Sequence, residues 1–135
     1  MMQKEPYIFL EHTADILFEA YGKTYSEAFE NSAHAMLSVF GKAGASERAS
    51  FSVTAHNLQE LTVQALADVL AYMDTHEIVF SKVEVASFDE ARKSLSFIAH
   101  GEKKRPRDTV KAVTYHELMV KEDKEGWTIR VLLDV

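Results

Sequence analysis

Two acidic side chains stand where the chain can hold them firmly. Asp15 closes the short polar connection His12–Asp15, and Asp134 follows the apolar run Val131–Leu133. If the last strand stays in its sheet to the end, Asp134 and the main-chain carboxylate of Val135 bring two negative charges side by side. Carboxylate oxygens suit calcium and magnesium better than the softer transition metals. These residues therefore predict a site for a hard divalent cation if Asp15 joins them.

Both side chains also have simpler interpretations. Asp15 is typical of an Asx-turn, in which its carboxylate accepts a hydrogen bond from a backbone amide two residues on. Lys111 or Arg130 could supply the positive charge that Asp134 needs, and such a salt bridge is as consistent with the sequence as a metal ion. The residue types alone leave these alternatives open.

Other familiar site patterns are absent from the sequence. The six histidines form no HxxxH or HxH pair, and they are His12, His34, His56, His76, His100 and His116. There is no cysteine, which excludes thiolate metal sites, disulfides and a cysteine nucleophile. No glycine-rich phosphate loop and no GxSxG motif occurs, so common nucleotide-binding and serine-hydrolase classes are disfavoured. We expect His34 and His56 to lie on the surface, and His76 to cap the end of a helix.

Length and charge narrow the class of protein. The chain has 135 residues, which predicts one domain over residues 1–135. Its formal net charge of -6 argues against a global positive field for nucleic acid. The basic run Lys103–Arg107 is a local exception, which we interpret as a solvated loop. Met1–Pro6 has no signal-peptide core and no stretch is long enough for a membrane span, so we expect a cytoplasmic protein.

Apolar periodicity predicts two helices, each with a start signal. Thr24 with Glu27, and Asn57 with Glu60, have the spacing of a capping box. Each pair precedes an apolar stripe with a period near 3.6 residues, and Gly41 stands where the first helix should end. Both helices therefore present a face to a core.

Seven alternating or apolar runs predict strands, at residues 7–11, 16–21, 49–55, 78–87, 93–101, 110–121 and 127–133. The last four follow one another, which favours an antiparallel meander. The order predicts an α+β fold, in which two helices pack on one face of a mostly antiparallel mixed β-sheet in a single-domain sandwich.

Motifs spread over nearly the whole chain resemble the archease family. They are His12–Ile16, Ala20–Thr24 followed by Glu27–Phe29, Lys111–His116, and a closing Asp134 with one apolar residue after it. Archeases assist RtcB-type RNA ligases, which join RNA ends in tRNA splicing and RNA repair, and they bind a divalent ion. The family was earlier described as chaperone-like.

The resemblance implies a metal site made by Asp15, Asp134 and the main chain of Val135. Calcium is the first expectation for the ion, with magnesium as the other candidate. His12 and Thr13 would shape the turn that carries the first ligand.

The motif Lys111–His116 would add functional residues near the same site. Lys111 would meet the ligase or its nucleotide, although a salt bridge to one of the carboxylates is its simpler role. One departure from the family is the segment Lys103–Thr109, which is shorter here than in many members.

The function implied is that of a protein cofactor without enzymatic activity, which promotes guanylylation and multiple turnover of the ligase. RNA would be reached only through the ligase, and no membrane is involved. One rival is a metal-dependent hydrolase that uses Asp15 and Asp134 with His12 or His116 as general base. Another is a chaperone-like interaction module, which would need a large exposed apolar patch.

Overall fold

The computed structural model describes residues 5–135. The expectation about a signal peptide rests partly on Met1–Lys4, which lie outside the described residues. The elements are β1 (Tyr7–Leu10), β2 (Ile16–Gly22), α1 (Tyr25–Ser38), β3 (Glu47–Thr54), α2 (Leu58–His76), β4 (Ile78–Asp89), β5 (Ser94–Lys103), β6 (Ala112–Asp123) and β7 (Gly126–Asp134). Each corresponds to a predicted element, with ends that differ by a few residues.

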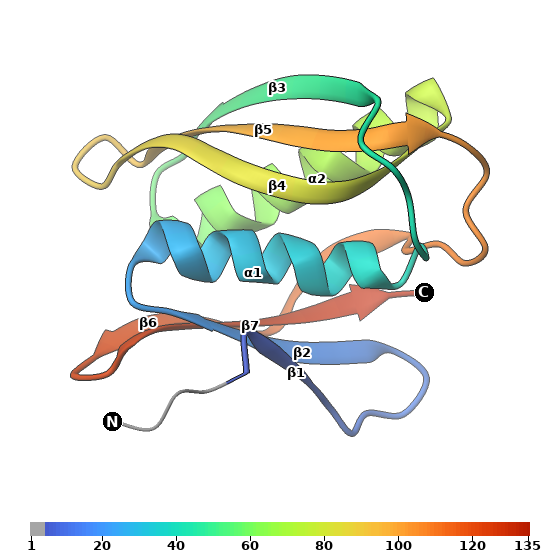
Figure 1. The fold of residues 1–135 in the computed structure, drawn as a ribbon. Coiled ribbons are helices and arrows are strands. Elements are labelled where there is room, and N and C mark those ends of the chain that lie inside the picture. Colours follow the sequence, from blue (N-terminus) through green and yellow to red (C-terminus); the bar gives the residue numbers. More distant parts are fainter. Residues whose placement is uncertain (1–4) are drawn as a thin grey trace.

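The strands form two antiparallel sheets with the helices between them. One sheet has the order β1-β2-β7-β6 and the other has the order β3-β5-β4. Figure 1 shows the three-stranded sheet above, the two helices in the middle and the four-stranded sheet below. The predicted α+β class is confirmed, but the helices are covered on two sides by two sheets, where a single sheet on one side was expected.

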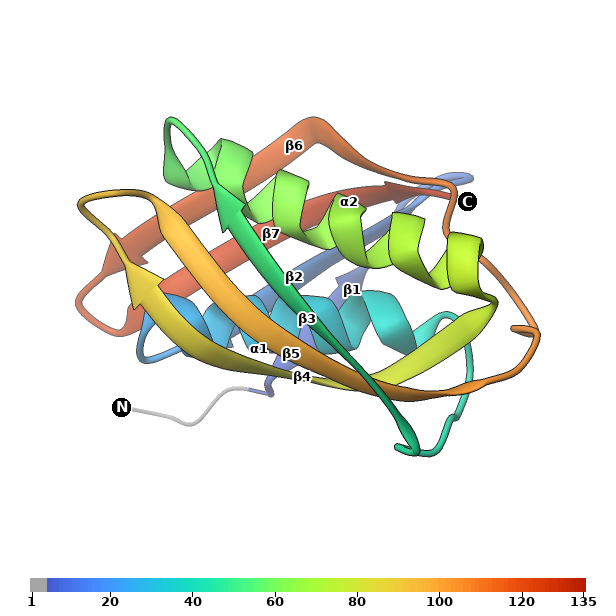
Figure 2. The same cartoon turned by 90° about the horizontal axis from the view of Figure 1, so that it is seen from above.

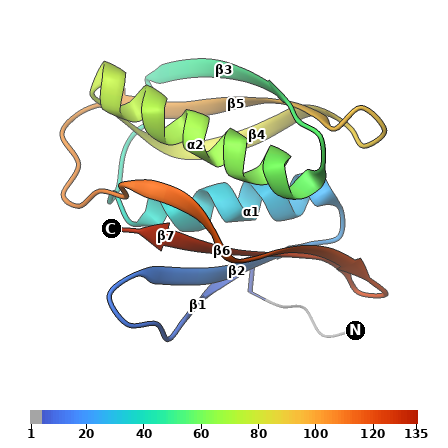
Figure 3. The same ribbon diagram turned by 180° about the vertical axis from the view of Figure 1, so that it is seen from behind.

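The helices bury more of their surface than the predicted stripes. In α1 the small residues Ser32 and Ala35 are fully buried in addition to the large apolar ones. This helix contacts β2 and β7 of one sheet and β4 of the other, while α2 contacts β6 and β3 (Figure 3). Alanine and serine add little to a hydrophobic pattern, so the second buried side was not visible in the sequence. Buried residues from both sheets and both helices form one core.

The predicted four-stranded meander is wrong. β4 pairs with β5 and β6 pairs with β7, but β5 and β6 belong to different sheets. Residues 104–111 connect the two hairpins and cross from one sheet to the other, and the strands of the two sheets run in clearly different directions (Figure 2). Short hairpin pairings are local in sequence, whereas the sheet that a hairpin joins is decided by packing on the helices.

Both predicted helix starts are confirmed. The Thr24 hydroxyl accepts the Glu27 N–H at 3.1 Å, and the Asn57 amide oxygen accepts the Glu60 N–H at 2.8 Å. Each bond satisfies an amide that the first turn leaves free. Neither of the helices found in residues 5–135 has the length and apolar character needed to cross a membrane.

Candidate metal site at the ends of β2 and β7

The pairing of β2 with β7 brings the predicted ligands to one edge of the four-stranded sheet. Ile16 lies opposite Leu133, so the next residue of each segment, Asp15 and Asp134, lies at the same end of neighbouring strands. Asp15 is half-buried, whereas Asp134 and Val135 are exposed. Figures 1 and 2 show the C-terminal residue near the β1–β2 connection. Segments more than a hundred residues apart in sequence therefore meet here.

The β1–β2 connection is a tight turn that fixes the position of Asp15. The Asp15 N–H donates to the Thr13 carbonyl at 2.8 Å, and Ala14 between them has a φ of 73°. This is the geometry of a γ-turn, which is strained for a residue with a side chain. The expected Asx-turn is not seen, because within residues 5–135 the Asp15 carboxylate accepts no hydrogen bond. That carboxylate is free for another partner.

Lys111 and Arg130 do not form the salt bridges that the alternative interpretation required. Arg130 donates two bonds to one carboxylate oxygen of Glu19, at 2.9 and 2.7 Å, so the alternative in which it pairs with Asp134 is wrong. Lys111 meets Asp134 through the main chain, because its N–H donates to the Asp134 carbonyl at 2.7 Å. In the part of the chain that the structure describes, no ion pair within 4.0 Å involves Lys111, Asp15 or Asp134. The two carboxylates therefore lack a cation.

Glu117 connects the turn to strand β6, and it was not among the predicted site residues. The register of β6 on β7 shifts between Thr114 and Met119, and Glu117 in this bulge has a φ of 56°. Its carboxylate lies 3.0 Å from Nε2 of His12, while Nδ1 of His12 lies 3.2 Å from the Thr13 carbonyl. A carboxylate and a carbonyl only accept, so each of these contacts is a hydrogen bond when the facing ring nitrogen carries a proton. We call this pair the His12–Glu117 clasp.

Glu117 directly follows the Lys111–His116 motif, so the clasp connects this motif to the turn that contains His12. His116 itself is exposed, and among residues 5–135 its side chain forms no hydrogen bond or ion pair. A positive φ at a glutamate cannot be read from residue types, so only the bulged register could have pointed to Glu117.

The expectation that His34 lies on the surface is wrong. His34 is half-buried, and its Nε2 accepts the N–H of Val83 at 3.0 Å. Burial lowers the pKa of His34 below its usual value and outweighs the opposing charge of Glu30. His34 therefore caps the free edge of β4 as a neutral ring, and it takes no part in the site.

Two other histidine predictions are confirmed. His56 is exposed and contacts Glu60 at 3.0 Å. His76 ends α2, and its Nδ1 lies 3.1 Å from the Tyr72 carbonyl in the last turn. Both histidines contact groups at the ends of α2, so they are not candidates for the metal site.

The donor set decides what kind of ion could be held. Within residues 5–135, no group of three His, Cys, Asp or Glu side chains is placed to hold a metal ion. Asp15 and Asp134 are thus only two candidate ligands, and a site for an ion would need further oxygens, such as one from the main chain of Val135 and others from water or a partner. An open, all-oxygen set suits calcium or magnesium, and it does not suit a structural zinc site.

Comparisons with known proteins agree with the motifs. The archease protein family matches residues 7–135. The protein archease of Methanosarcina acetivorans is 36% identical over 143 aligned residues, which cover 98% of each chain. The solution structure of Methanobacterium thermoautotrophicum protein 1598 is 34% identical, with a TM-score of 0.82 over 96% of this chain and 99% of that one.

A crystal structure from Thermotoga maritima, described as an archease and possible chaperone, has a TM-score of 0.66 at 21% identity and covers 100% of this chain and 98% of that one. At that identity it supports the fold alone. The sequence relative and the solution structure are both more than 30% identical over nearly the whole chain. The chain therefore belongs to the archease protein family.

Proposed function

We propose that this protein activates an RtcB-type RNA ligase without being an enzyme itself. It promotes guanylylation and multiple turnover of the ligase in tRNA splicing and RNA repair, in the cytoplasm. The observation that carries the proposal is the register of β2 on β7, which pairs Ile16 with Leu133, so that Asp15 and Asp134 follow at the same end of neighbouring strands. Membership of the archease family supports the same reading.

A divalent ion fits this group of oxygens. Asp15, Asp134 and the main chain of Val135 would hold calcium, or magnesium as the alternative. Two carboxylates without a cation partner favour such an ion, because a bound positive charge offsets their mutual repulsion. When bound, the ion would supply an open coordination sphere to oxygen or phosphate groups of the partner. The chain's own contribution is to hold the ligands through the turn and the strand register.

Lys111 adds a cation next to the two carboxylates. Its main chain is fixed by the bond to Asp134, while its exposed side chain can extend toward a partner. We assign it to contact with the ligase or the ligase-bound nucleotide, because an ammonium group that is not already paired can meet phosphate at little cost.

The contacts of the two His12 ring nitrogens argue against the hydrolase alternative. A general base must have a free ring nitrogen within about 3 Å of the proton that it removes. Both nitrogens of His12 lie within 3.2 Å of acceptors in the clasp, so neither faces a position that a substrate could take. His116 is free but exposed, in a bulge rather than a pocket.

The chaperone alternative needs an extended apolar surface. The exposed large hydrophobic residues of the described chain are Ile8, Phe9, Tyr115 and Val135. Ile8 and Phe9 are consecutive in β1, so they point to opposite faces of the sheet. Four scattered residues do not make the patch that holding unfolded chains requires.

The proposal is tested by ligase turnover with RNA in excess and by transfer of labelled GMP to the ligase. Asp15→Asn and Asp134→Asn should each lower the stimulation by at least about tenfold, since loss of groups that support a metal ligand already costs that much. Glu122→Gln is the matched control, because Glu122 is exposed in the β6–β7 hairpin.

Each alternative predicts a different result. If both asparagine variants stimulate the ligase as well as the unchanged protein, the metal-site mechanism is refuted. Metal-dependent release from phosphoesters without ligase would favour the hydrolase. Suppression of aggregation at stoichiometric amounts, with no effect on the ligase, would favour the chaperone.

A further inference from the structure

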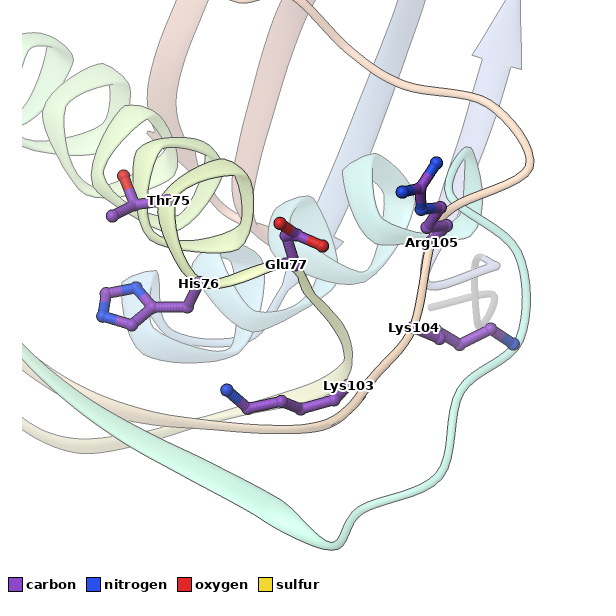
Figure 4. A pocket seen from close by; sticks show the side chains of 6 residues that line it. All are labelled: Thr75, His76, Glu77, Lys103, Lys104 and Arg105. Atoms are coloured by element: carbon purple, nitrogen blue, oxygen red, sulfur yellow. The ribbon is translucent and has the colours of Figure 1, made fainter.

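A pocket lies at the C-terminal end of α2, away from the carboxylates. It has a volume of about 420 Å³, within the range of ligand sites, and opens widely to solvent. Its lining residues are Thr75, His76, Glu77, Lys103, Lys104 and Arg105 (Figure 4). We call it the basic pocket.

The lining concentrates positive charge in an otherwise acidic protein. The chain has 21 acidic and 15 basic residues, yet the segment 103–107 holds four basic residues and no acidic one. Of the six lining residues three are basic and one is acidic, so their formal charge is +2 with His76 neutral. A local field of this sign attracts anions even where the whole molecule repels them.

Two of these cations are not used by the fold. Lys104 donates from Nζ to the Lys42 carbonyl at 2.7 Å, which anchors the segment. Within residues 5–135, neither Lys103 nor Arg105 forms an ion pair or a side-chain hydrogen bond. Figure 4 shows the Lys103 side chain running toward the His76 side of the pocket, whereas Lys104 points the opposite way. Cations that line one pocket and form no ion pair within residues 5–135 favour an anionic ligand.

The pocket and the candidate metal site are at the same end of the molecule. Residues 104–111 begin at the pocket and end at Lys111, whose N–H is bonded to the Asp134 carbonyl at 2.7 Å. Figure 3 shows this connection passing beside the C-terminal residue as it runs between the two sheets. The basic pocket therefore lies on the side of the molecule that the proposed function assigns to the ligase.

We propose that the basic pocket binds phosphate groups of single-stranded RNA, through Lys103 and Arg105. Arg105 offers a planar fork that matches phosphate oxygens, and Lys103 offers a mobile point charge. Thr75 supplies a hydroxyl donor on the same rim. The contact is to the RNA backbone and carries no sequence preference. As a role in ligation it rests on the proposed function, but binding itself is measured without the ligase.

The test is fluorescence anisotropy of a labelled single-stranded RNA with the full chain alone, at several salt concentrations. The two cations of the proposed contact predict that the logarithm of the binding constant falls with the logarithm of salt at a slope of about −1.4. In the double variant Lys103→Gln and Arg105→Gln this salt dependence should nearly vanish, with at least tenfold weaker binding at low salt. Glu77→Gln should tighten binding, because it removes the one acid of the lining.

The control is the double variant Lys121→Gln and Lys124→Gln, which changes the net charge equally on exposed lysines of the β6–β7 hairpin. It should bind RNA like the unchanged protein. Equal weakening in this control, or no RNA binding at low salt, overturns the proposal. Displacement of RNA by inorganic phosphate at matched phosphate concentration would assign the pocket to free phosphate and overturn the RNA assignment.

Whether the basic pocket binds RNA can be decided independently of the proposed function. Asp134→Asn should leave RNA binding unchanged while it abolishes ligase stimulation. Absence of RNA binding by the unchanged protein, together with intact ligase stimulation, would remove the pocket proposal alone.

Discussion

Replacement of Asp134 by asparagine should change stability in opposite directions with and without a metal ion. In a chelator the carboxylates of Asp15 and Asp134 have no cation partner among residues 5–135. Removing one charge then relieves repulsion, so Asp134→Asn should melt at the same temperature as the unchanged protein or slightly higher. With calcium the order should reverse, because the variant has lost a ligand.

The size of the calcium effect follows from mass action. An ion that binds only the folded state adds about 2.7 kcal/mol at a concentration one hundred times its dissociation constant. For a chain of 135 residues, each kcal/mol moves the melting temperature by about 3 to 4 °C, so the unchanged protein should gain ~10 °C. Asp134→Asn should gain less than about 3 °C under the same conditions.

Thermal unfolding followed by circular dichroism in EDTA, calcium and magnesium measures this difference. Glu122→Gln should show the full calcium effect, which controls for general loss of negative charge. The reasoning is refuted if Asp134→Asn keeps the full gain, or if the unchanged protein gains nothing from either ion.

Three further changes test the fold away from the site. His34 accepts the Val83 N–H and its pKa is lowered by burial, so on acidification the unfolded chain takes up a proton at this residue before the folded chain does. The free energy of unfolding should therefore be constant above about pH 6.5 and fall below it by up to ~1.4 kcal/mol per pH unit. Urea titrations should show that His34→Gln flattens this dependence. Gly101→Ala should unfold the protein or destabilise it by several kcal/mol, since an added Cβ would overlap a β4 carbonyl oxygen, whereas Gly44→Ala should be tolerated; yield and melting temperature would show the contrast. Thr24→Ala should cost about 1 kcal/mol in chemical denaturation, because α1 loses its cap.

Local structure could be predicted from the sequence because its causes are local. Thr24 and Asn57 satisfy amides three residues away, so both helix starts depend on neighbours in the chain. The two hairpins, β4 with β5 and β6 with β7, likewise join strands that follow one another. For such features the residue types contain most of the information.

The division into two sheets could not be predicted in the same way. It depends on both sides of each helix being buried, and the second side of α1 is made partly by Ser32 and Ala35, which carry little hydrophobic signal. His34 was misjudged for the same reason, since its partner is an edge amide of β4 far along the chain. The clasp residue Glu117 depends on a bulge that only the pairing of β6 with β7 reveals.

The register of β2 on β7 explains why Asp15 and Asp134 could be anticipated as partners. Phe18 pairs with Val131 and Ile16 pairs with Leu133, and three of these four side chains are fully buried against the helices. A slip of one residue would turn them all to the opposite face, so the core holds the register firmly. The same constraint sets the two carboxylates at one edge whether or not an ion is present. The fold should therefore survive chelation, and the ion should act on partner contact and on stability without being needed for folding.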